Sequence, residues 1–253
     1  MVSLLLKDLL YLNKNVLFLG EGNFSFSAGL VKALVTESEA EGVTLKHLDN
    51  LWTTCFESDK SKEDLNEKNI SAGDLKRTNA DYLRKQGCHV MEGVDAEKLT
   101  LDPRLTGLCF SRIIFMFPHV GGKMKIHRNR ALLLNVISSC REMVTEDGEI
   151  VITLARGQGG TPAEAEARSI GDTWRLVDTC HEAGCVLTRV QEFCPEQHLG
   201  YSQVISFELK EVILCVLLAG WISRTVQEIQ CRWSLNSHHD EEGTPQCPYS
   251  HVS

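Results

Sequence analysis

The chain has 253 residues, of which 43% are hydrophobic and 24% charged, which is ordinary for a globular protein and enough for one large α/β domain. Its formal net charge of −8 excludes a surface that is basic overall, so contacts with nucleic acid have to come from a local patch. No apolar run reaches the roughly 20 residues of a membrane-spanning helix, and residues 1–12 are too short and too charged for a signal peptide.

The ten cysteines form no Cys-x-x-Cys pair, which argues against a zinc ribbon and against a thioredoxin-like redox motif. Several lie in apolar runs, where we expect small buried hydrophobes of a reducing, intracellular compartment: Cys55, Cys88, Cys109, Cys140 and Cys180.

The first predicted elements are a strand, a tight turn and a helix start over residues 16–27. An apolar run breaks on Gly20 and Gly22, and apolar residues then recur at helical spacing. Glycine permits positive φ and leaves no Cβ between backbone and ligand, while Asn23 or Ser25 can cap the helix. Such a turn suits an adenosine-type ligand, although Gly-x-Gly turns also occur at strand-to-helix corners that bind no cofactor.

A second strand is predicted over residues 50–56, and it is followed by an acid, Glu57. In nucleotide-binding α/β folds a carboxylate at the tip of the second strand accepts hydrogen bonds from the ribose hydroxyls, which is the role we expect for Glu57, with Asp59 as the second choice. The alternative is an acid on a solvated loop. Residues 63–86 are polar and predict one or two helices with a break near residues 70–73.

Two further strands are predicted over residues 88–93 and 111–117. The first leads to Asp95, which can accept a hydrogen bond from an adenine amino group at the carboxyl end of the sheet. The second is a nearly continuous apolar run, which indicates a central parallel strand that is buried on both faces. It ends in a loop that begins with Pro118 and His119.

The densest basic cluster of the chain follows this loop and contains Lys123, Lys125, Arg128 and Arg130. We predict a helix over residues 130–144 directly after it, and cations at a helix N-terminus oppose the helix dipole. A solvated segment is the usual explanation of such a run. An external anion, the phosphate backbone of RNA, is the explanation that we expect here.

Strands and helices keep alternating up to residue 201. We predict strands over residues 149–154 and 186–190, with a helix over residues 173–183 between them, and a loop over residues 155–166 that carries little sequence information. This alternation predicts an α/β fold with a mostly parallel sheet and helices on both faces.

The pattern changes toward the end of the chain. We divide the sequence into a domain at residues 10–201, an atypical apolar segment at residues 202–235 and a disordered polar tail at residues 236–253. The apolar core of the middle segment is too short to span a membrane, so we expect an edge strand or a helix docked on the sheet. His238 and His239 in the tail resemble metal ligands, but no second cluster at zinc spacing accompanies them, and we expect no metal.

Several motifs stand together in chain order: Gly20-Glu21-Gly22-Asn23-Phe24-Ser25-Phe26-Ser27, Glu57-Ser58, Gly93-Val94-Asp95-Ala96, the run from Arg112 to Gly122, and Asn129-Arg130. The set resembles the Rossmann-like domain of the ribosomal RNA uridine-N3 methyltransferase-like family, over residues 10–201. The resemblance implies a class I S-adenosylmethionine-dependent methyltransferase fold with a seven-stranded mixed sheet. It also implies methylation of ribosomal RNA in the cytoplasm or nucleolus.

The resemblance also assigns roles to the matching residues. The catalytic segment would be Phe117-Pro118-His119, in which we expect His119 to act as the base that takes the uracil N3 proton. The alternative is that His119 only caps its loop and a backbone carbonyl orients the base. S-adenosylmethionine would be bound by Gly20, Glu21, Gly22, Asn23, Phe24, Ser25, Glu57, Asp95 and Ala96.

The sequence departs from related patterns at a few positions. The general methyltransferase pattern has an acid where this chain has Phe18 and a third glycine where it has Phe24, a difference that the family shares. Met116 stands where many family members carry a polar residue. An RNA-associated binding module without chemistry is the alternative function. A nicotinamide-dependent oxidoreductase would need a third glycine near Ser25 and an acid about 20 residues after the first strand, and the sequence has neither.

Overall fold

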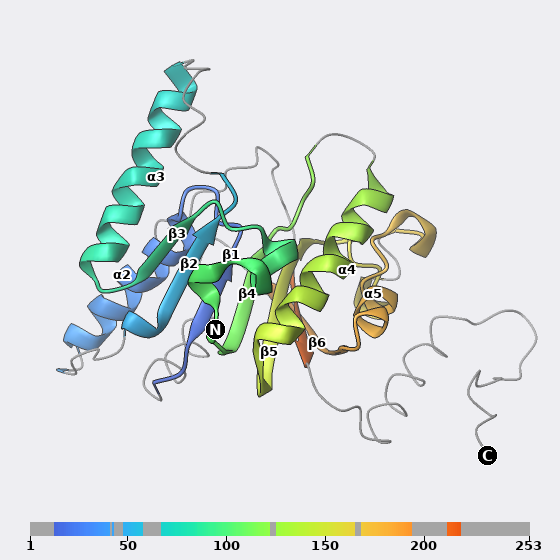
Figure 1. Ribbon diagram of the computed structural model, residues 1–253. Coiled ribbons are helices and arrows are strands. Elements are labelled where there is room, and N and C mark those ends of the chain that lie inside the picture. The colour runs from blue at the N-terminus through green and yellow to red at the C-terminus, as the bar shows by residue number, and fades with distance from the viewer. Residues whose placement is uncertain are drawn as a thin grey trace, which may run out of the picture.

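The computed structural model describes residues 13–40, 42, 48–57, 67–121, 125–164, 168–193 and 212–218. Within this part of the chain, seven strands form one sheet with helices on both faces (Figure 1). The strands are β1 (Val16–Leu19), β2 (Leu51–Cys55), β3 (His89–Glu92), β4 (Phe110–Met116), β5 (Val144–Ala155), β6 (Val186–Phe193) and β7 (Val212–Leu218). The α-helices are α2 (Ser25–Ala40), α3 (Glu67–Lys85), α4 (Ile126–Met143) and α5 (Leu176–Glu182). Short 3₁₀ helices are η1 (Leu48–Asn50), η2 (Ala96–Leu101), η3 (Pro103–Leu105), η4 (Pro162–Glu164) and η5 (Ile170–Asp172).

The sheet has the strand order β3-β2-β1-β4-β5-β7-β6. Strands β1 to β5 are parallel, and β7 pairs antiparallel with both β5 and β6. This mixed seven-stranded sheet confirms the Rossmann-like class I fold that the family resemblance implied. The parallel strands end together at one edge, which lies at the top of Figure 1 and is called the carboxyl edge below. Ligands of open α/β sheets bind at this edge.

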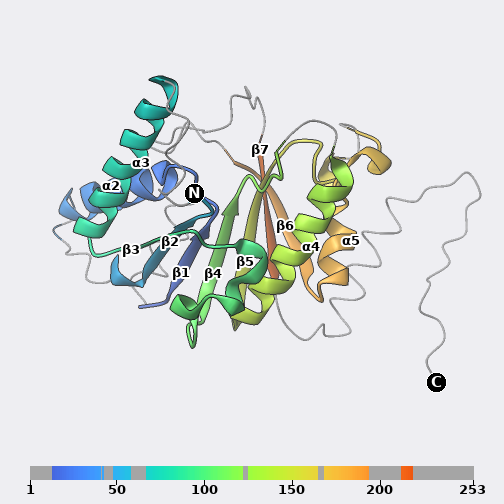
Figure 2. The same cartoon turned by 45° about the horizontal axis from the view of Figure 1, so that its top comes forward.

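Each face of the sheet has its own apolar core, because successive residues of a strand point to opposite faces. In β1, Val16 and Phe18 pack with α2 and α3, while Leu17 and Leu19 pack with α4 and α5, and all four are fully buried. Figure 2 shows the two helical layers on either side of the strands. Burial of each such side chain contributes about 1.5–3 kcal/mol, so the two layers fix the ends of the strands at the carboxyl edge.

Four of the five cysteines that were expected inside are buried, whereas Cys109 is exposed and was predicted wrongly. It lies just before β4, outside the sheet. Desolvation raises the pKa of the Cys88 thiol to about 12 and that of Cys185 to about 11, so these thiols stay protonated and behave as small apolar side chains.

Three predicted helices have different bounds in the structure, and of these α5 runs from Leu176 to Glu182 rather than over residues 173–183. Helix α3 runs without a break across residues 70–73, because one glycine in a helix costs only about 1 kcal/mol and the buried Ala80 and Leu83 hold the helix on the sheet. Helix α4 begins at Ile126 rather than near Arg130, with Lys125 at its N-cap position and no side-chain capping bond. The basic cluster therefore includes the first turn of this helix.

The apolar segment after residue 201 was expected at the edge of the sheet or on its face, and this expectation was wrong. Strand β7 lies between β5 and β6, with Cys215, Val216 and Leu217 buried. It pairs with β5 from Glu149 to Ala155 and with β6 along its other side. The sheet that carries the carboxyl edge thus includes residues that the sequence analysis separated from it.

Candidate active site

The turn after β1 packs tightly against the central strand β4. Gly20 has φ +69°, and a Cβ at this position would lie 2.4 Å from Phe115 Cε2, so only glycine fits here without moving the ring. Phe24 is also left-handed, with φ 58°, which costs a non-glycine residue roughly 1–2 kcal/mol. Complete burial of its ring offsets this cost. Phe24 stands at the N-cap position of α2, which was expected for Asn23 or Ser25, and Asn23 instead precedes it and accepts the Ser25 N–H on its Oδ1 at 3.1 Å.

Glu21 is buried beneath this turn, with 6% of its surface exposed. Its carboxylate accepts hydrogen bonds from the Ser27 N–H at 3.0 Å, the Thr53 hydroxyl at 3.0 Å and the Ser27 hydroxyl. Desolvation raises the pKa of this carboxyl above 4.5, although the Ser27 and Thr53 bonds oppose the shift. The observed partners of Glu21 therefore join the turn to α2 and β2, whereas its predicted contact with a cofactor stays a prediction.

The end of β2 carries the predicted ribose ligand. The Glu57 side chain is exposed at the carboxyl edge, and its backbone oxygen accepts a hydrogen bond from Lys76 Nζ at 2.9 Å. The Cys55 thiol donates to the same oxygen at 3.0 Å. An exposed carboxylate on a fixed backbone is suited to accept hydrogen bonds from ribose hydroxyls. The second choice, Asp59, lies outside the described residues.

The loop after β3 brings Asp95 beside the end of β2, because the Val94 N–H donates to the Cys55 carbonyl at 3.0 Å. Asp95 caps η2 through the Glu97 N–H at 3.0 Å and pairs with Lys98 at 3.3 Å. Ala96 follows as the first residue of η2. Glu57 and Asp95, which the sequence analysis named separately, thus follow neighbouring strands of one edge.

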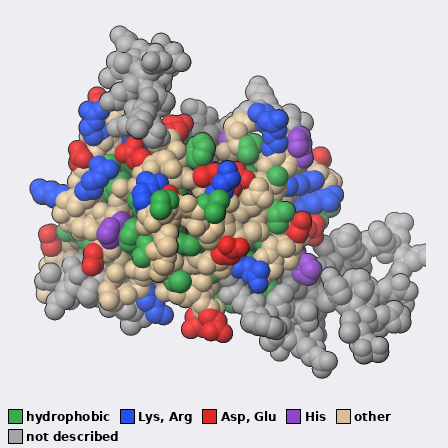
Figure 3. Space-filling view, in the orientation of Figure 1, with side chains coloured by type: hydrophobic (Ala, Val, Ile, Leu, Met, Phe, Trp, Pro, Cys, Tyr) green, Lys and Arg blue, Asp and Glu red, His purple; other side chains and the backbone are tan. Residues whose placement is uncertain are grey.

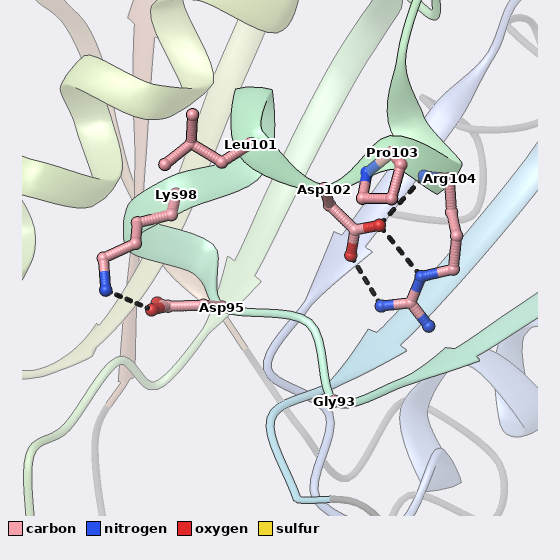
Figure 4. Close-up of a pocket in the computed structure, with 7 residues that line it drawn as sticks. All are labelled: Gly93, Asp95, Lys98, Leu101, Asp102, Pro103 and Arg104. Atoms are coloured by element: carbon pink, nitrogen blue, oxygen red, sulfur yellow. Dashed lines mark hydrogen bonds and ion pairs between the residues drawn. The ribbon is translucent and has the colours of Figure 1, made fainter.

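A surface hollow of about 360 Å³ opens next to Asp95 (Figure 4). Arg104 stands on its wall and donates to the Glu92 carbonyl at 2.9 Å, which holds the end of β3. The hydrogen bonds from Arg104 also lower the pKa of Asp102 below its usual value. The hollow is in the size range of small-ligand sites and is lined by Gly93, Asp95, Lys98, Leu101, Asp102, Pro103 and Arg104.

The predicted catalytic segment follows β4 and begins with a strained residue. Phe117 has φ 53°, and its N–H donates to the Thr153 hydroxyl at 2.9 Å and to the Thr153 carbonyl at 3.2 Å. Pro118 is buried, whereas His119 and Val120 are exposed. The Val120 N–H donates to Asn129 Oδ1 at 3.1 Å, so the loop is held by side chains of β5 and α4.

His119 makes the loop-capping contact that was left open as the alternative to a base. Its Nδ1 accepts the Gly121 N–H at 2.9 Å. A neutral imidazole with an accepting Nδ1 carries its proton on Nε2, so Nε2 is a donor in this arrangement. In the conformation described, His119 is therefore equipped to donate to an acceptor oxygen, and its use as a base requires the Gly121 contact to break.

Basic side chains gather at the start of α4 and on the segment after β5, at the upper right of Figure 3. Arg128 and His127 are exposed in the first turn of α4. Arg130 instead donates through Nε and Nη2 to the Thr173 carbonyl and through Nη2 to the Gly171 carbonyl at 2.7 Å. Arg130 therefore ties α4 to the β5–α5 segment. Lys123 lies outside the described residues.

The β5–α5 segment is more ordered than its sequence suggested. Glu164 is buried, and its carboxylate accepts hydrogen bonds from the Gly157 N–H, the Thr161 N–H at 3.2 Å and the Thr161 hydroxyl at 2.8 Å. The Glu164 N–H in turn donates to the Thr161 carbonyl at 2.9 Å, so Thr161 and Glu164 close the 3₁₀ turn η4, which has Pro162 as its first residue. In the sequence, Thr161-Pro162-Ala163-Glu164 is the signal for this turn, because proline is favoured at the first helical position.

Within the described ranges, no group of three or more His, Cys, Asp or Glu side chains could hold a metal ion. The histidines of the polar tail lie outside these ranges. The same part of the chain contains no helix that is long and apolar enough to cross a membrane.

Comparison with known proteins identifies relatives for most of the chain. It is 32% identical over 188 residues to the human ferredoxin-fold anticodon-binding domain-containing protein 1, covering 74% of this chain and 27% of that protein. The mouse homolog is 33% identical over 190 residues, covering 75% and 28%. The chain thus spans less than a third of the length of these relatives.

A solved structure, the glycopeptide N-methyltransferase MtfA complexed with sinefungin, superposes with a TM-score of 0.49 and 12% identity, over 86% of this chain and 85% of that one. The BMT5-like family, described as rRNA (uridine-N3-)-methyltransferase, matches residues 17–204, which include β1 after its first residue, β2 to β6 and every candidate site residue. On this match, the chain belongs to the BMT5-like family.

Proposed function

We propose that this chain is an S-adenosylmethionine-dependent methyltransferase that methylates N3 of uridine in RNA, with ribosomal RNA as its substrate. The observation that carries the proposal is the arrangement of the family motifs on one edge of the sheet. The glycine turn, Glu57 and Asp95 follow β1, β2 and β3, and the Phe117-Pro118-His119 loop follows the adjacent β4. The family description supports the uridine-N3 assignment.

The residues at this edge fit an adenosine ligand. Glu57 offers an exposed carboxylate for ribose hydroxyls, and Asp95 offers one beside a hollow of about 360 Å³. When bound, S-adenosylmethionine would supply an electrophilic methyl group. The contribution of the chain is then to hold the uracil in line with that methyl group and to remove the N3 proton, since the N3 lone pair becomes available only when the proton leaves.

His119 is the residue that we propose for this proton. In the conformation described, its Nδ1 is occupied by the Gly121 N–H. We propose that this contact breaks as the base enters the loop, so that Nδ1 can accept the N3 proton. Before that step, the Nε2 proton can donate to a uracil carbonyl oxygen and orient the ring. The left-handed Phe117, fixed by Thr153, sets the direction in which the loop leaves β4.

RNA would lie across the basic cluster beside this loop. Lys125 and Arg128 stand at the start of α4, six and nine residues after His119 in the chain, and Arg128 is exposed. Arg130 serves chiefly to hold the β5–α5 segment, since its observed bonds go to backbone carbonyls. Phosphate contacts by such cations position a nucleic acid without reading its sequence, which leaves recognition of uracil to the loop.

The runner-up function is an RNA-associated binding module without methyl transfer. The loop-capping bond of His119 favours it, because a histidine held in this way has a structural role that needs no chemistry.

Methyl transfer from labelled S-adenosylmethionine to total RNA, followed by nucleoside analysis, tests the proposal. We expect label in 3-methyluridine with the wild-type chain and none with a Gly22→Leu, Glu57→Ala double variant. Label in another nucleoside would overturn the uridine-N3 assignment. The assignment of the cofactor site would be overturned if wild type and the double variant bound S-adenosylmethionine equally, or if wild type bound NAD in preference to it.

A further inference from the structure

Helix α3 contributes none of the predicted site residues, yet one stripe of it reaches the carboxyl edge. Lys76 and Asn79 are three residues apart and therefore lie on the same face of the helix. Ala80 and Leu83, further along the same face, are buried in the core under α2 and α3. The apolar end of the stripe anchors the helix on the sheet, and its polar end faces the loops that leave β1, β2 and β3.

Lys76 bonds to the loop after β2 and to the end of β3, and it lies near the turn after β1. Its ammonium donates to the Glu57 carbonyl at 2.9 Å and to Glu92 Oε2, at the end of β3, at 3.1 Å. It also lies 6.0 Å from the centre of the Phe24 ring, in the turn after β1. Only 13% of the side chain is exposed. Hydrogen bonds from a partly buried ammonium group are charge-assisted and strong, so Lys76 holds its two acceptors, the Glu57 carbonyl and the Glu92 carboxylate, in place.

Asn79 holds the turn after β1 by a second contact. It is 6% exposed, and its Nδ2 donates to the Asn23 carbonyl at 2.9 Å. The Asn23 side chain in turn accepts the N–H of Ser25, the first residue of α2. Asn79 therefore fixes the backbone between Gly22 and the first turn of α2, which is the part of the chain predicted to lie under the cofactor.

We propose that Lys76 and Asn79 are positioning residues that preorganise the cofactor site, a role that rests on the proposed function. They hold the loops carrying the glycine turn, Glu57 and Asp95 in one arrangement before the cofactor arrives. Loops that are ordered in advance lose less conformational entropy on binding, so the affinity is higher. The two side chains contact the loops through backbone oxygens and Glu92, and they need not touch the cofactor.

The test compares the full-length chain with Lys76→Met, with Asn79→Ala and with a control on the same helix, Arg77→Met, whose side chain is exposed. Calorimetry measures the dissociation constant for S-adenosylmethionine, and scanning calorimetry measures the melting temperature of each cofactor-free protein. We expect Lys76→Met to raise the dissociation constant about tenfold, because a hydrogen bond to a charged group is lost. Lys76→Arg should restore part of the affinity, and Arg77→Met should change neither quantity.

Amide hydrogen exchange gives a readout that a purely structural role would not move. In Lys76→Met, the amides of residues 20–25 and 92–95 should exchange faster, while those of the α4 and α5 layer keep wild-type rates. An unchanged dissociation constant with a lower melting temperature would overturn the inference, as would unchanged exchange in these loops. If Lys76→Met does not fold, the same measurements on Asn79→Ala test the inference.

The inference and the proposed function can fail separately. Wild-type protein that binds no S-adenosylmethionine would overturn the proposed function, and the exchange rates would still show whether α3 orders the loops. Wild-type protein that binds the cofactor, with variants of equal affinity, would overturn the inference alone.

Discussion

The two halves of the carboxyl edge are built differently. In the half formed by β1, β2 and β3, the loops are held by side chains that are themselves buried, namely Glu21, Asn79 and most of Lys76. In the half formed by β4 and β5, the side chain that would meet the acceptor, His119, is exposed. Buried side chains hold the loops of the first half. In the second half Thr153 and Asn129 hold the loop backbone, and the adaptable part is the exposed imidazole of His119, which can turn when its Gly121 contact breaks. Preorganised loops suit the binding of a small cofactor, and an exposed side chain that can reorient suits the binding of an RNA base.

The largest expected effect comes from removing β7, which belongs to the acceptor half. A chain ended after residue 209 should lose its cooperative thermal transition, because β5 and β6 lose the strand that joins them and the buried Cys215, Val216 and Leu217 are gone. Circular dichroism during heating measures this. A chain ended after residue 235 serves as the control. A cooperative transition in the shorter chain would show that β7 is dispensable and that the first half folds without it.

Much of the parallel part of the sheet was predictable from sequence, because the signals of its strands are local. The apolar run of β4 indicated a central strand, and the structure buries Ile113 and Phe115 on one face and Ile114 and Met116 on the other. The position of β7 was not predictable in this way. A short apolar run does not reveal which strands it pairs with, and this one joins β5 and β6 across a long stretch of sequence.

The functional residues that the sequence did not indicate are polar side chains. They lie on elements whose composition is typical of solvent-exposed segments. Lys76 and Asn79 belong to a helix of polar composition, in which nothing marks two inward residues. Glu21 was named only through the family motif, and its buried contacts with Ser27 and Thr53 depend on the packing of α2 against β2. The start of α4 was placed too late because Lys125 gives no side-chain cap.

The next effect concerns chemistry in the second half. His119→Ala should lower the methylation rate 100-fold or more, within the range of general acid–base catalysis, and leave the affinities for cofactor and RNA intact. Single-turnover transfer to RNA measures the rate. Val120→Ala, at the neighbouring exposed position, should be close to wild type. Near-normal turnover of His119→Ala would leave the histidine with the loop-capping role alone.

A smaller effect is expected from the basic cluster that flanks the acceptor loop. Lys125→Glu with Arg128→Glu should weaken binding to a uridine-containing single-stranded RNA about tenfold and should reduce the slope of log affinity against log salt by roughly 1.5. The matched control carries the same charge change at the exposed Lys14 and Lys85. Equal slopes for the two double variants would show that net charge, and not this cluster, governs RNA binding.

The smallest expected effect is on the pH dependence of stability, which reflects the free-energy cost of burying the Glu21 carboxylate beneath the β1 turn. Because the folded-state pKa of Glu21 is raised above 4.5, the folded state binds more protons than the unfolded state as the pH rises past that value. The contribution of this carboxyl to stability therefore falls with rising pH. In urea titrations, the free energy of unfolding of Glu21→Gln minus that of wild type should therefore increase between about pH 5 and about pH 8. A constant difference over this range would contradict the raised pKa, and Glu39→Gln, at an exposed position on α2, is the control.

The place of β7 also governs the order in which the sheet can be assembled. While the chain is being synthesised, β5 and β6 emerge before the strand that pairs with both, so the backbone N–H and C=O groups along one side of β5 have no partner strand. Pairings between distant segments are slow to form, because loop closure has to precede the contacts that stabilise it. The acceptor half is therefore the last part of the sheet to close, and the nascent protein passes through a state with an open sheet edge that a chaperone would have to shield.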